Sequence, residues 1–413
     1  MSQAYRPLLQ VLLLLIGAGA GGPELVSAAR AEPVLERVVL VQRHGVRAPT
    51  QSSQLLESWT ARPWPIWPVA SGELTDQGAD VVALVADGIR AHYVERGLLP
   101  AKGCPGDGLV VWADSRDERT RRSGEQMAAH LAPGCSVSAA SGTPGTRDPL
   151  FKSAEGACRF EPGPAADALR EAIGPGGKLA GSTEPAIADI FSILKPGAPA
   201  PDPAASRFEV DPYEIVLTGP LAVAADTGEI FLLEYAQGFA SDDVAWGAAP
   251  DAARFASWLG PRNRLSDLTR ALPYAAVRQG GAMARFMIES LALEPRAAAP
   301  AIGESAKLIA LAGHDDNLSN MAGVFGADWT LPGQPDETAP ATAFALERWR
   351  EPTNGDVWVR LTLFYAELEG MRALDPKAVH ALSIALPGCG GRACPLEQVR
   401  ARVHALVPEA CRG

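Results

Sequence analysis

Three short apolar runs alternate with helical patterns along the chain. The runs at 37–42, 109–113 and 308–312 consist mainly of Val, Leu, Ile and Ala, a pattern typical of strands that are buried on both faces of a sheet. Apolar residues recur every three or four positions in other stretches, which predict helices at 75–90, 118–131 and 265–293. Because strands alternate with helices, we expect an α/β fold with a mainly parallel central sheet flanked by helices.

Helix-start and helix-breaking residues refine these stretches. Thr75 is a capping signal at the start of its helix. Pro273 and the pair Gly280–Gly281 are expected to kink or interrupt the stretch 265–293.

Near the C-terminus, Asn354–Gly355 separates the apolar runs 344–350 and 357–365. This dipeptide is typical of a tight β-hairpin. We therefore expect these runs to form an antiparallel hairpin that forms or extends the edge of the sheet.

The middle of the chain has a different composition. Residues 140–210 are rich in Gly, Pro, Ala and Ser and are expected to hold surface loops, whereas 211–240 has a helical pattern. We expect residues 141–259 to form a smaller, mainly helical and loop-rich cap domain, inserted into an α/β domain made of 32–140 and 260–413.

The N-terminus has the features of an export signal. Arg6 precedes the apolar stretch 8–16, and small residues follow it, with cleavage expected near Ala28 or Ala31. The apolar run is too short to span a bilayer, which disfavours a membrane anchor. We expect residues 1–31 to be removed, and the mature protein to be periplasmic or secreted and not bound to a membrane.

The net charge and the cysteines indicate which partners and which cross-links the chain can have. The 413 residues carry a net charge of −11, which disfavours nucleic acid as a partner because phosphate backbones need a basic surface. Six cysteines in an exported chain favour disulfides, and their pairing stays open among about 15 combinations. A zinc site is disfavoured because no C-x-x-C motif is present. We expect a monomer, although its oligomeric state is not fixed by the sequence, and no metal or cofactor.

Polar clusters follow each of the three apolar runs, at 43–50, 114–121 and 313–317. The carboxyl ends of parallel strands line the ligand crevice in open α/β sheets, so the three clusters are expected to meet. Closely spaced arginines favour an anion between them, and arginine binds phosphate through two hydrogen bonds at once.

His44 lies between Arg43 and Arg47 in the first cluster. Their positive charges lower the pKa of His44 and favour a neutral imidazole, which can attack phosphorus and form a phosphohistidine. Asp315 is the candidate proton donor to the leaving alkoxide. Nearby cations are expected to keep the pKa of Asp315 low, so that it holds its proton mainly in acid.

Other interpretations remain open. Each cluster alone is compatible with a solvated turn or an exposed helix start. A metal-dependent phosphohydrolase needs several converging ligands, and the sequence offers a single His-Asp pair. A non-catalytic phosphate binder is disfavoured because His44 and Asp315 are both present. The remaining histidines are interpreted as structural or surface groups.

The segment 43–49, Arg-His-Gly-Val-Arg-Ala-Pro, resembles the R-H-G-x-R-x-P signature of the histidine acid phosphatases, and His314–Asp315 resembles their downstream H-D motif. Further similarity to the bacterial periplasmic phytase and acid phosphatase branch extends over nearly the whole mature chain. It includes segments 72–75, 117–121, 148–151, 229–233 and 329–335.

The resemblance implies metal-independent hydrolysis of phosphate monoesters, with phytate, a sugar phosphate or a broad range of esters as substrate. His44 is then the nucleophile and Asp315 the proton donor. The residues expected to hold the phosphoryl oxygens are Arg43, Arg47, Arg119 and His314. Thr50, Asp316 and Glu229 are expected in the substrate pocket. The implied disulfides are Cys104–Cys135, Cys158–Cys411 and Cys389–Cys394.

Three departures from the family bear on the substrate. Gln51 stands where bacterial phytases carry Lys, and Asp316 stands where a small neutral residue is usual. A carboxylate at 316 is expected to raise the pKa of Asp315 or to repel highly anionic substrates. The cation that phytases use for distal phosphates has no secure counterpart near Arg278. These departures weaken phytate as the preferred substrate.

Overall fold

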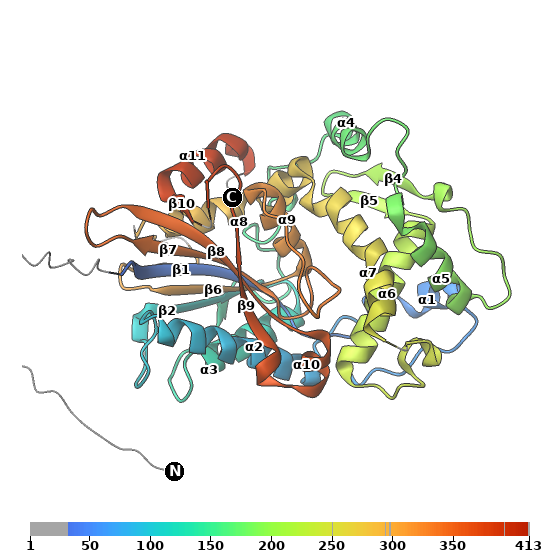
Figure 1. Cartoon of the computed structure of the whole chain (residues 1–413), viewed down its shortest axis with the longest axis horizontal. Helices are drawn as coiled ribbons and strands as arrows, with labels where there is room; N and C mark the ends of the chain where they lie inside the picture. Colours follow the sequence, from blue (N-terminus) through green and yellow to red (C-terminus); the bar gives the residue numbers. More distant parts are fainter. Residues whose placement is uncertain (1–31, 250, 294, 297–298, 392, 412–413) are drawn as a thin grey trace, which may run out of the picture.

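The computed structural model describes residues 32–249, 251–293, 295–296, 299–391 and 393–411 (Figure 1). The expected leader at 1–31 lies outside the described residues. Within them, the strands are β1 (Val34–Arg43), β2 (Leu109–Ala113), β3 (Ala140–Ser141), β4 (Arg207–Val210), β5 (Ile215–Thr218), β6 (Leu308–Gly313), β7 (Ala343–Arg350), β8 (Val357–Ala366), β9 (Val379–Ile384) and β10 (Ala393–Pro395).

The helices have the following bounds. They are α1 (Ser53–Trp59), α2 (Asp76–Glu95), α3 (Glu118–Leu131), α4 (Pro162–Ile173), α5 (Glu184–Leu194), α6 (Pro220–Gln237), α7 (Ala252–Ser266), α8 (Pro273–Ser290), α9 (Asp315–Phe325), α10 (Leu368–Ala373) and α11 (Leu396–Leu406). A π-helical turn, η6 (Asp267–Ala271), joins α7 to α8.

The central sheet is mixed, in the order β10-β8-β7-β1-β6-β2-β3, with β9 paired to β8. Its parallel part consists of β1, β6, β2 and β3, and the remaining pairs are antiparallel. The expected parallel core is therefore confirmed, and so is the hairpin, which β7 and β8 form. The parallel strands β1, β6 and β2 all end at the same edge of the sheet.

Both faces of the sheet are covered by helices, which explains the continuous apolar runs. Along β1, Val38 and Leu40 belong to one buried cluster, and Val39 and Val41 belong to another on the opposite face. Figure 1 shows α2 and α3 on one face and α8 and α11 on the other. Because every side chain of β6 is also buried, these strands have no polar face.

Helices α4 to α7 lie at one end of the sheet together with the two-stranded sheet β4–β5 (Figure 1). Helices α5, α6 and α7 pack against one another. The division of the chain into two domains at residues 140 and 260 stays a prediction.

Two expectations about the middle of the chain are incomplete. Residues 140–210 contain α4 and α5 as well as loops, and residues 215–218 of the expected helical stretch form β5. The Gly and Pro residues that flank α4 and α5 made these stretches resemble loops. Each helix nevertheless buries an apolar side, which includes Leu169 in α4 and Ile190 in α5.

The long helical stretch breaks at Pro273, as expected, but not at Gly280–Gly281. Pro273 begins α8, where its missing N–H costs no hydrogen bond. The two glycines lie inside α8 because the helix packs closely there: a Cβ at Gly280 would lie 2.6 Å from the Asn320 Cβ, and one at Gly281 would lie 2.9 Å from the Cys411 carbonyl oxygen.

Capping and disulfides agree with expectation. The Thr75 side chain accepts a hydrogen bond from the Gly78 N–H at 2.9 Å and caps α2. The three expected disulfides are present, Cys104–Cys135, Cys158–Cys411 and Cys389–Cys394. Among the described residues, no helix combines the length and apolar character that a membrane crossing requires.

Candidate active site

The three polar clusters meet where β1, β6 and β2 end. Arg43 pairs with Gly313 across β1 and β6, and the His44 N–H donates to the Gly313 carbonyl at 2.9 Å. The Asp114 N–H donates to the Ala312 carbonyl at 3.0 Å, which brings the end of β2 beside β6. A cavity of about 400 Å³ opens at this edge. The convergence expected from the sequence is therefore present.

His44 is 1% exposed, and one hydrogen bond fixes the tautomer of its ring. Its Nδ1 lies 2.8 Å from the Gly45 carbonyl oxygen, which only accepts, so Nδ1 carries the proton and Nε2 keeps its lone pair. Burial lowers the pKa of His44 well below its usual value, and the charges of Arg119 and Arg43 lower it further. The ring is therefore neutral, with a free nucleophilic nitrogen.

A close backbone approach holds this part of the chain. A Cβ at Gly45 would lie 1.9 Å from the carbonyl oxygen of Gly78, in the first turn of α2. Glycine at position 45 therefore lets the segment after β1 lie directly against α2, and this contact supports the position of His44.

Arg43 and Arg47 are held by one carboxylate from α6. Arg43 donates to Glu229 Oε1 at 2.5 Å, and Arg47 donates to Glu229 Oε2 at 3.2 Å. Burial raises the pKa of Glu229, but the charges of Arg262, Arg47 and Arg43 outweigh it and bring the pKa to about 2. Glu229 is therefore ionised and orients two guanidiniums, a role that its place in the sequence did not indicate.

Each of these arginines keeps a donor that no protein atom satisfies. Within the described residues, the Nε atoms of Arg43, Arg47 and Arg119 are buried and have no hydrogen-bond partner. Buried donors without partners are costly, and an anion bound among them would satisfy them.

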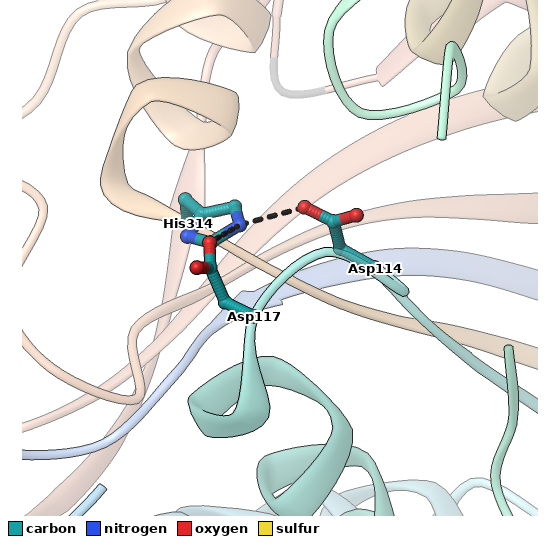
Figure 2. A group of neighbouring side chains, drawn as sticks. All are labelled: Asp114, Asp117 and His314. Atoms are coloured by element: carbon teal, nitrogen blue, oxygen red, sulfur yellow. Dashed lines mark hydrogen bonds and ion pairs between the residues drawn. The ribbon is translucent and has the colours of Figure 1, made fainter. Parts of the chain in front are cut away.

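Arg119 and His314 lie beside two aspartates from the loop after β2. His314 Nε2 lies 2.8 Å from Asp114 Oδ2 and 3.7 Å from Asp117 Oδ2, and both contacts are drawn in Figure 2. Arg119 donates to Asp117 at 3.0 Å, and its Nη2 lies 3.5 Å from His314 Nδ1. The ring of His314 lies 5.6 Å from that of His44.

The group Asp114, Asp117 and His314 also has the residue types of a metal site, with ligand atoms within 4.8 Å of one another. The Arg119 guanidinium donates into the same group, however, and its fixed positive charge disfavours a divalent cation there. The arrangement instead fits a hydrogen-bonded side of an anion pocket, in which Arg119 supplies the cation.

Asp315 begins α9 and is held by two further arginines. Its Oδ2 accepts from Arg262 Nη2 at 2.7 Å and from Arg270 Nη1. Burial raises the pKa of Asp315, but Arg270, Arg43 and other cations lower it more, so the pKa lies well below its usual value. The sequence did not single out Arg262 or Arg270, because their patterns match those of ordinary helix surface residues.

The expected pocket residues Thr50, Asp316 and Glu229 all line the cavity. The carboxylate at 316 was expected to raise the pKa of Asp315. The arginines around Asp315 lower this pKa more strongly, so it lies below its usual value. Arg278 does not line the cavity: it contacts Glu161 and lies over the Tyr274 ring.

The rest of the rim carries further charged side chains. Asp226 lines the cavity, and its carboxyl accepts a hydrogen bond from Gln51. Burial raises the pKa of Asp226. Three further cations also line the cavity, namely Arg116, Arg147 and Lys152.

Comparisons with known proteins agree with this site. Residues 34–157 match the family described as the histidine phosphatase superfamily (branch 2). The chain is 32% identical to Phytase AppA of Escherichia coli, over 88% of this chain and 89% of that protein. It is 24% identical to a glucose-1-phosphatase of Salmonella typhimurium, over 93% of this chain and 97% of that protein. The structure of Hafnia alvei phytase in complex with tartrate superposes with a TM-score of 0.85 at 32% identity, covering 93% of this chain and 99% of that one.

Proposed function

The chain belongs to branch 2 of the histidine phosphatase superfamily and is a phosphoric monoester hydrolase, and we propose that it acts through a phosphohistidine on His44. The observation that carries the proposal is the set of buried, unpartnered Nε donors on Arg43, Arg47 and Arg119, beside a neutral imidazole with a free Nε2. Three guanidiniums can bind the oxygens of a phosphoryl group, and the imidazole can attack its phosphorus.

In the first step, His44 Nε2 attacks phosphorus, and the bond from phosphorus to the ester oxygen breaks. Asp315 donates a proton to the departing alkoxide, which leaves as the alcohol. The arginines balance the charge on the phosphoryl oxygens. Because Nδ1 of His44 donates to the Gly45 carbonyl, the ring keeps the tautomer that the attack requires.

In the second step, water attacks the phosphohistidine. The Asp315 carboxylate accepts a proton from this water, the bond from nitrogen to phosphorus breaks, and inorganic phosphate leaves. His44 returns to its neutral form and Asp315 is protonated again, so the cycle needs no metal and no other co-reactant.

We propose inositol phosphates as the first natural substrates to test, and sugar phosphates as the second. The similar proteins include a phytase and a glucose-1-phosphatase. A pocket of about 400 Å³ exceeds the size of a phosphate group, and the cations on its rim, Arg116, Arg147 and Lys152, suit an anionic substrate. Glu155 and Glu214 pair with these cations and limit their net charge.

We also propose that the chain is exported by its first 31 residues. The three disulfides support this, because such bonds persist in oxidising compartments. Cell fractionation and the N-terminal mass of the mature protein test it, and a protein retained in the cytoplasm with residues 1–31 intact would contradict it.

The test of the reaction is phosphate release from 4-nitrophenyl phosphate across acid to mildly alkaline pH, with excess EDTA. We expect activity that is highest in acid and is unaffected by EDTA. His44→Ala should abolish turnover, whereas the control His130→Ala, a surface residue paired with Asp87, should retain it. Activity that depends on an added divalent metal, or that survives in His44→Ala, would contradict the proposal.

A further inference from the structure

Arg262 of α7 lies between Arg43 and the proposed proton donor. Its side chain is 6% exposed. Its Nη2 donates to Asp315 Oδ2 at 2.7 Å and lies 2.9 Å from Glu229 Oε1, and its Nε donates to Asp336 Oδ2 at 3.4 Å. One guanidinium therefore contacts three carboxylates, which come from the start of α9, from α6 and from the segment before β7.

Arg43 contacts two of these carboxylates at the same oxygens. Its Nη2 donates to Glu229 Oε1 at 2.5 Å, and its Nη1 donates to Asp336 Oδ2 at 3.0 Å. Two guanidiniums and two carboxylates thus form a closed ring of balanced charge. The side chains of Arg43 and Asp336 are fully buried, where solvent and salt screen an ion pair little. The ring therefore fixes Arg262 relative to the end of β1, which carries Arg43 and the neighbouring His44.

The two oxygens of the Asp315 carboxylate have different surroundings. Its Oδ2 accepts hydrogen bonds from Arg262 and from Arg270. The side chain is 13% exposed and lines the cavity. A proton is least stable on the oxygen that already accepts from two guanidiniums. Oδ1 is therefore the oxygen on which Asp315 can carry a proton.

We propose that Arg262 is a positioning residue that couples the proton donor to the nucleophile: through the ring it fixes Asp315 relative to the end of β1, and by holding Oδ2 it leaves Oδ1 to carry the proton. This rests on the proposed hydrolysis at His44. The proton passes from Oδ1 to the alkoxide as the bond from phosphorus to oxygen breaks, and Arg262 keeps its own proton and its contacts. Because a misplacement of about 1 Å can cost about 100-fold in rate, a fixed position of the acid matters.

The charge of Arg262 has an effect that is separate from its position. Burial raises the pKa of Asp315, but Arg270, Arg43 and Arg262 lower it more, so it lies well below its usual value. Loss of one of these positive charges would raise this pKa, and Asp315 would then keep its proton to a higher pH. The other charged or titratable groups around it are Arg47 from the end of β1, Glu229 from α6, Asp336 through Arg262, and His314 and Asp316 on either side in the chain.

The experiment compares glycerol 2-phosphate, whose alkoxide needs a proton, with 4-nitrophenyl phosphate, whose leaving group needs it much less. The readout is the ratio of kcat/KM for the first ester to that for the second. Arg262→Gln should lower this ratio by about 10- to 100-fold, the range for losing one hydrogen bond to a charged group. Inhibition by inorganic phosphate should change little, because Arg43 keeps Glu229 and Asp336 as partners.

Arg262→Lys separates position from charge. The ammonium keeps the positive charge but lacks the planar fork that contacts three carboxylates at once. We expect a lowered ratio in both variants. In Arg262→Gln the activity on glycerol 2-phosphate should persist to a higher pH, whereas in Arg262→Lys it should fall at the pH of the unchanged enzyme. The control Arg254→Gln removes an arginine of the same helix that pairs with Asp189, and it should change neither the ratio nor the pH profile.

A double variant tests whether Arg262 acts through Asp315. In the Asp315→Asn background there is no acid left to position, so adding Arg262→Gln should leave the ratio unchanged. A merely structural role would instead lower kcat/KM on both esters alike and by the same factor in both backgrounds.

Three results would overturn the inference: an unchanged ratio in Arg262→Gln and Arg262→Lys, equal losses on the two esters, or a loss of ratio in the Asp315→Asn background as large as in the unchanged enzyme. If Arg262→Gln does not fold, Arg262→Lys serves in the ratio and double-variant measurements. Failure of the proposed function is distinguishable, because the unchanged enzyme would then hydrolyse neither ester, or Asp315→Asn alone would leave the ratio unchanged.

Discussion

His314 Nε2 lies 2.8 Å from Asp114 Oδ2, so the loop after β2 holds a histidine that follows β6. The two strands are parallel neighbours, which brings together residues 200 positions apart in the chain. The carboxylate fixes the orientation of the ring and leaves its Nδ1 edge beside Arg119. Asp114 therefore positions one side of the proposed phosphate pocket.

We expect Asp114→Asn to weaken inhibition by inorganic phosphate and to lower kcat/KM by about 10- to 100-fold, the range for losing a hydrogen bond to a charged group. The amide still fits the site but carries no charge to hold the histidine. Phosphate inhibition constants for the variant and the unchanged enzyme check this. Equal constants would show that the orientation of His314 does not depend on Asp114.

Asp315→Asn should separate substrates by their leaving groups. We expect a loss of about 10²- to 10⁴-fold on an alkyl phosphate, because its alkoxide needs a proton, and a much smaller loss on 4-nitrophenyl phosphate. Steady-state kinetics on both esters measure the difference, with the exposed Asp167→Asn as control. Equal losses on the two esters would contradict the role of Asp315 as proton donor.

Glu229→Gln should weaken phosphate binding and change the acid stability of the protein. The folded state lowers the pKa of Glu229 from 4.5 to about 2, so its ionised form stabilises the fold above the unfolded pKa. This contribution disappears as the pH falls from about 4.5 towards about 2. Denaturant unfolding at neutral pH and across this window should show a less stable variant at neutral pH and a flatter pH dependence. A pH dependence identical to that of the unchanged protein would oppose this assignment.

Gly45→Ala should destabilise the protein by about 1–3 kcal/mol, the usual cost of an overpacked contact, because the added methyl meets the backbone of α2. Chemical denaturation checks the value. Gly163→Ala is the control, since a Cβ there meets nothing within 4 Å. Equal stability of Gly45→Ala and the unchanged protein would mean that the segment after β1 can shift without cost.

Much of the fold could be predicted from local sequence. The runs that became β1, β2 and β6 are continuous because both of their faces are buried, and Asn354–Gly355 marks the hairpin. The prediction of a helix break at Gly280–Gly281 was wrong. These glycines allow α9 and the C-terminal segment to pack closely against α8, and this contact is not visible in the local sequence. Helices α4 and α5 are short and owe their stability to tertiary packing, which composition does not reveal.

Part of the site could also be predicted from local sequence. His44, Asp315 and the neighbouring arginines follow strand ends, and the edge of a parallel sheet brings such positions together. Arg262, Arg270 and Asp336 come from α7, η6 and the segment before β7, and their spacing carries no local signal. Their contacts with Asp315 and with one another depend on how α7 and η6 pack against α9, which only the folded chain fixes.

The most direct test of the central claim is to identify the residue that carries the phosphoryl group during turnover. The enzyme is mixed with 4-nitrophenyl phosphate, quenched in alkali, digested, and mapped by mass spectrometry under conditions that preserve phosphohistidine. We predict a phosphate on His44, with none in His44→Ala. A phosphate on another residue, or full turnover by His44→Ala, would contradict the account.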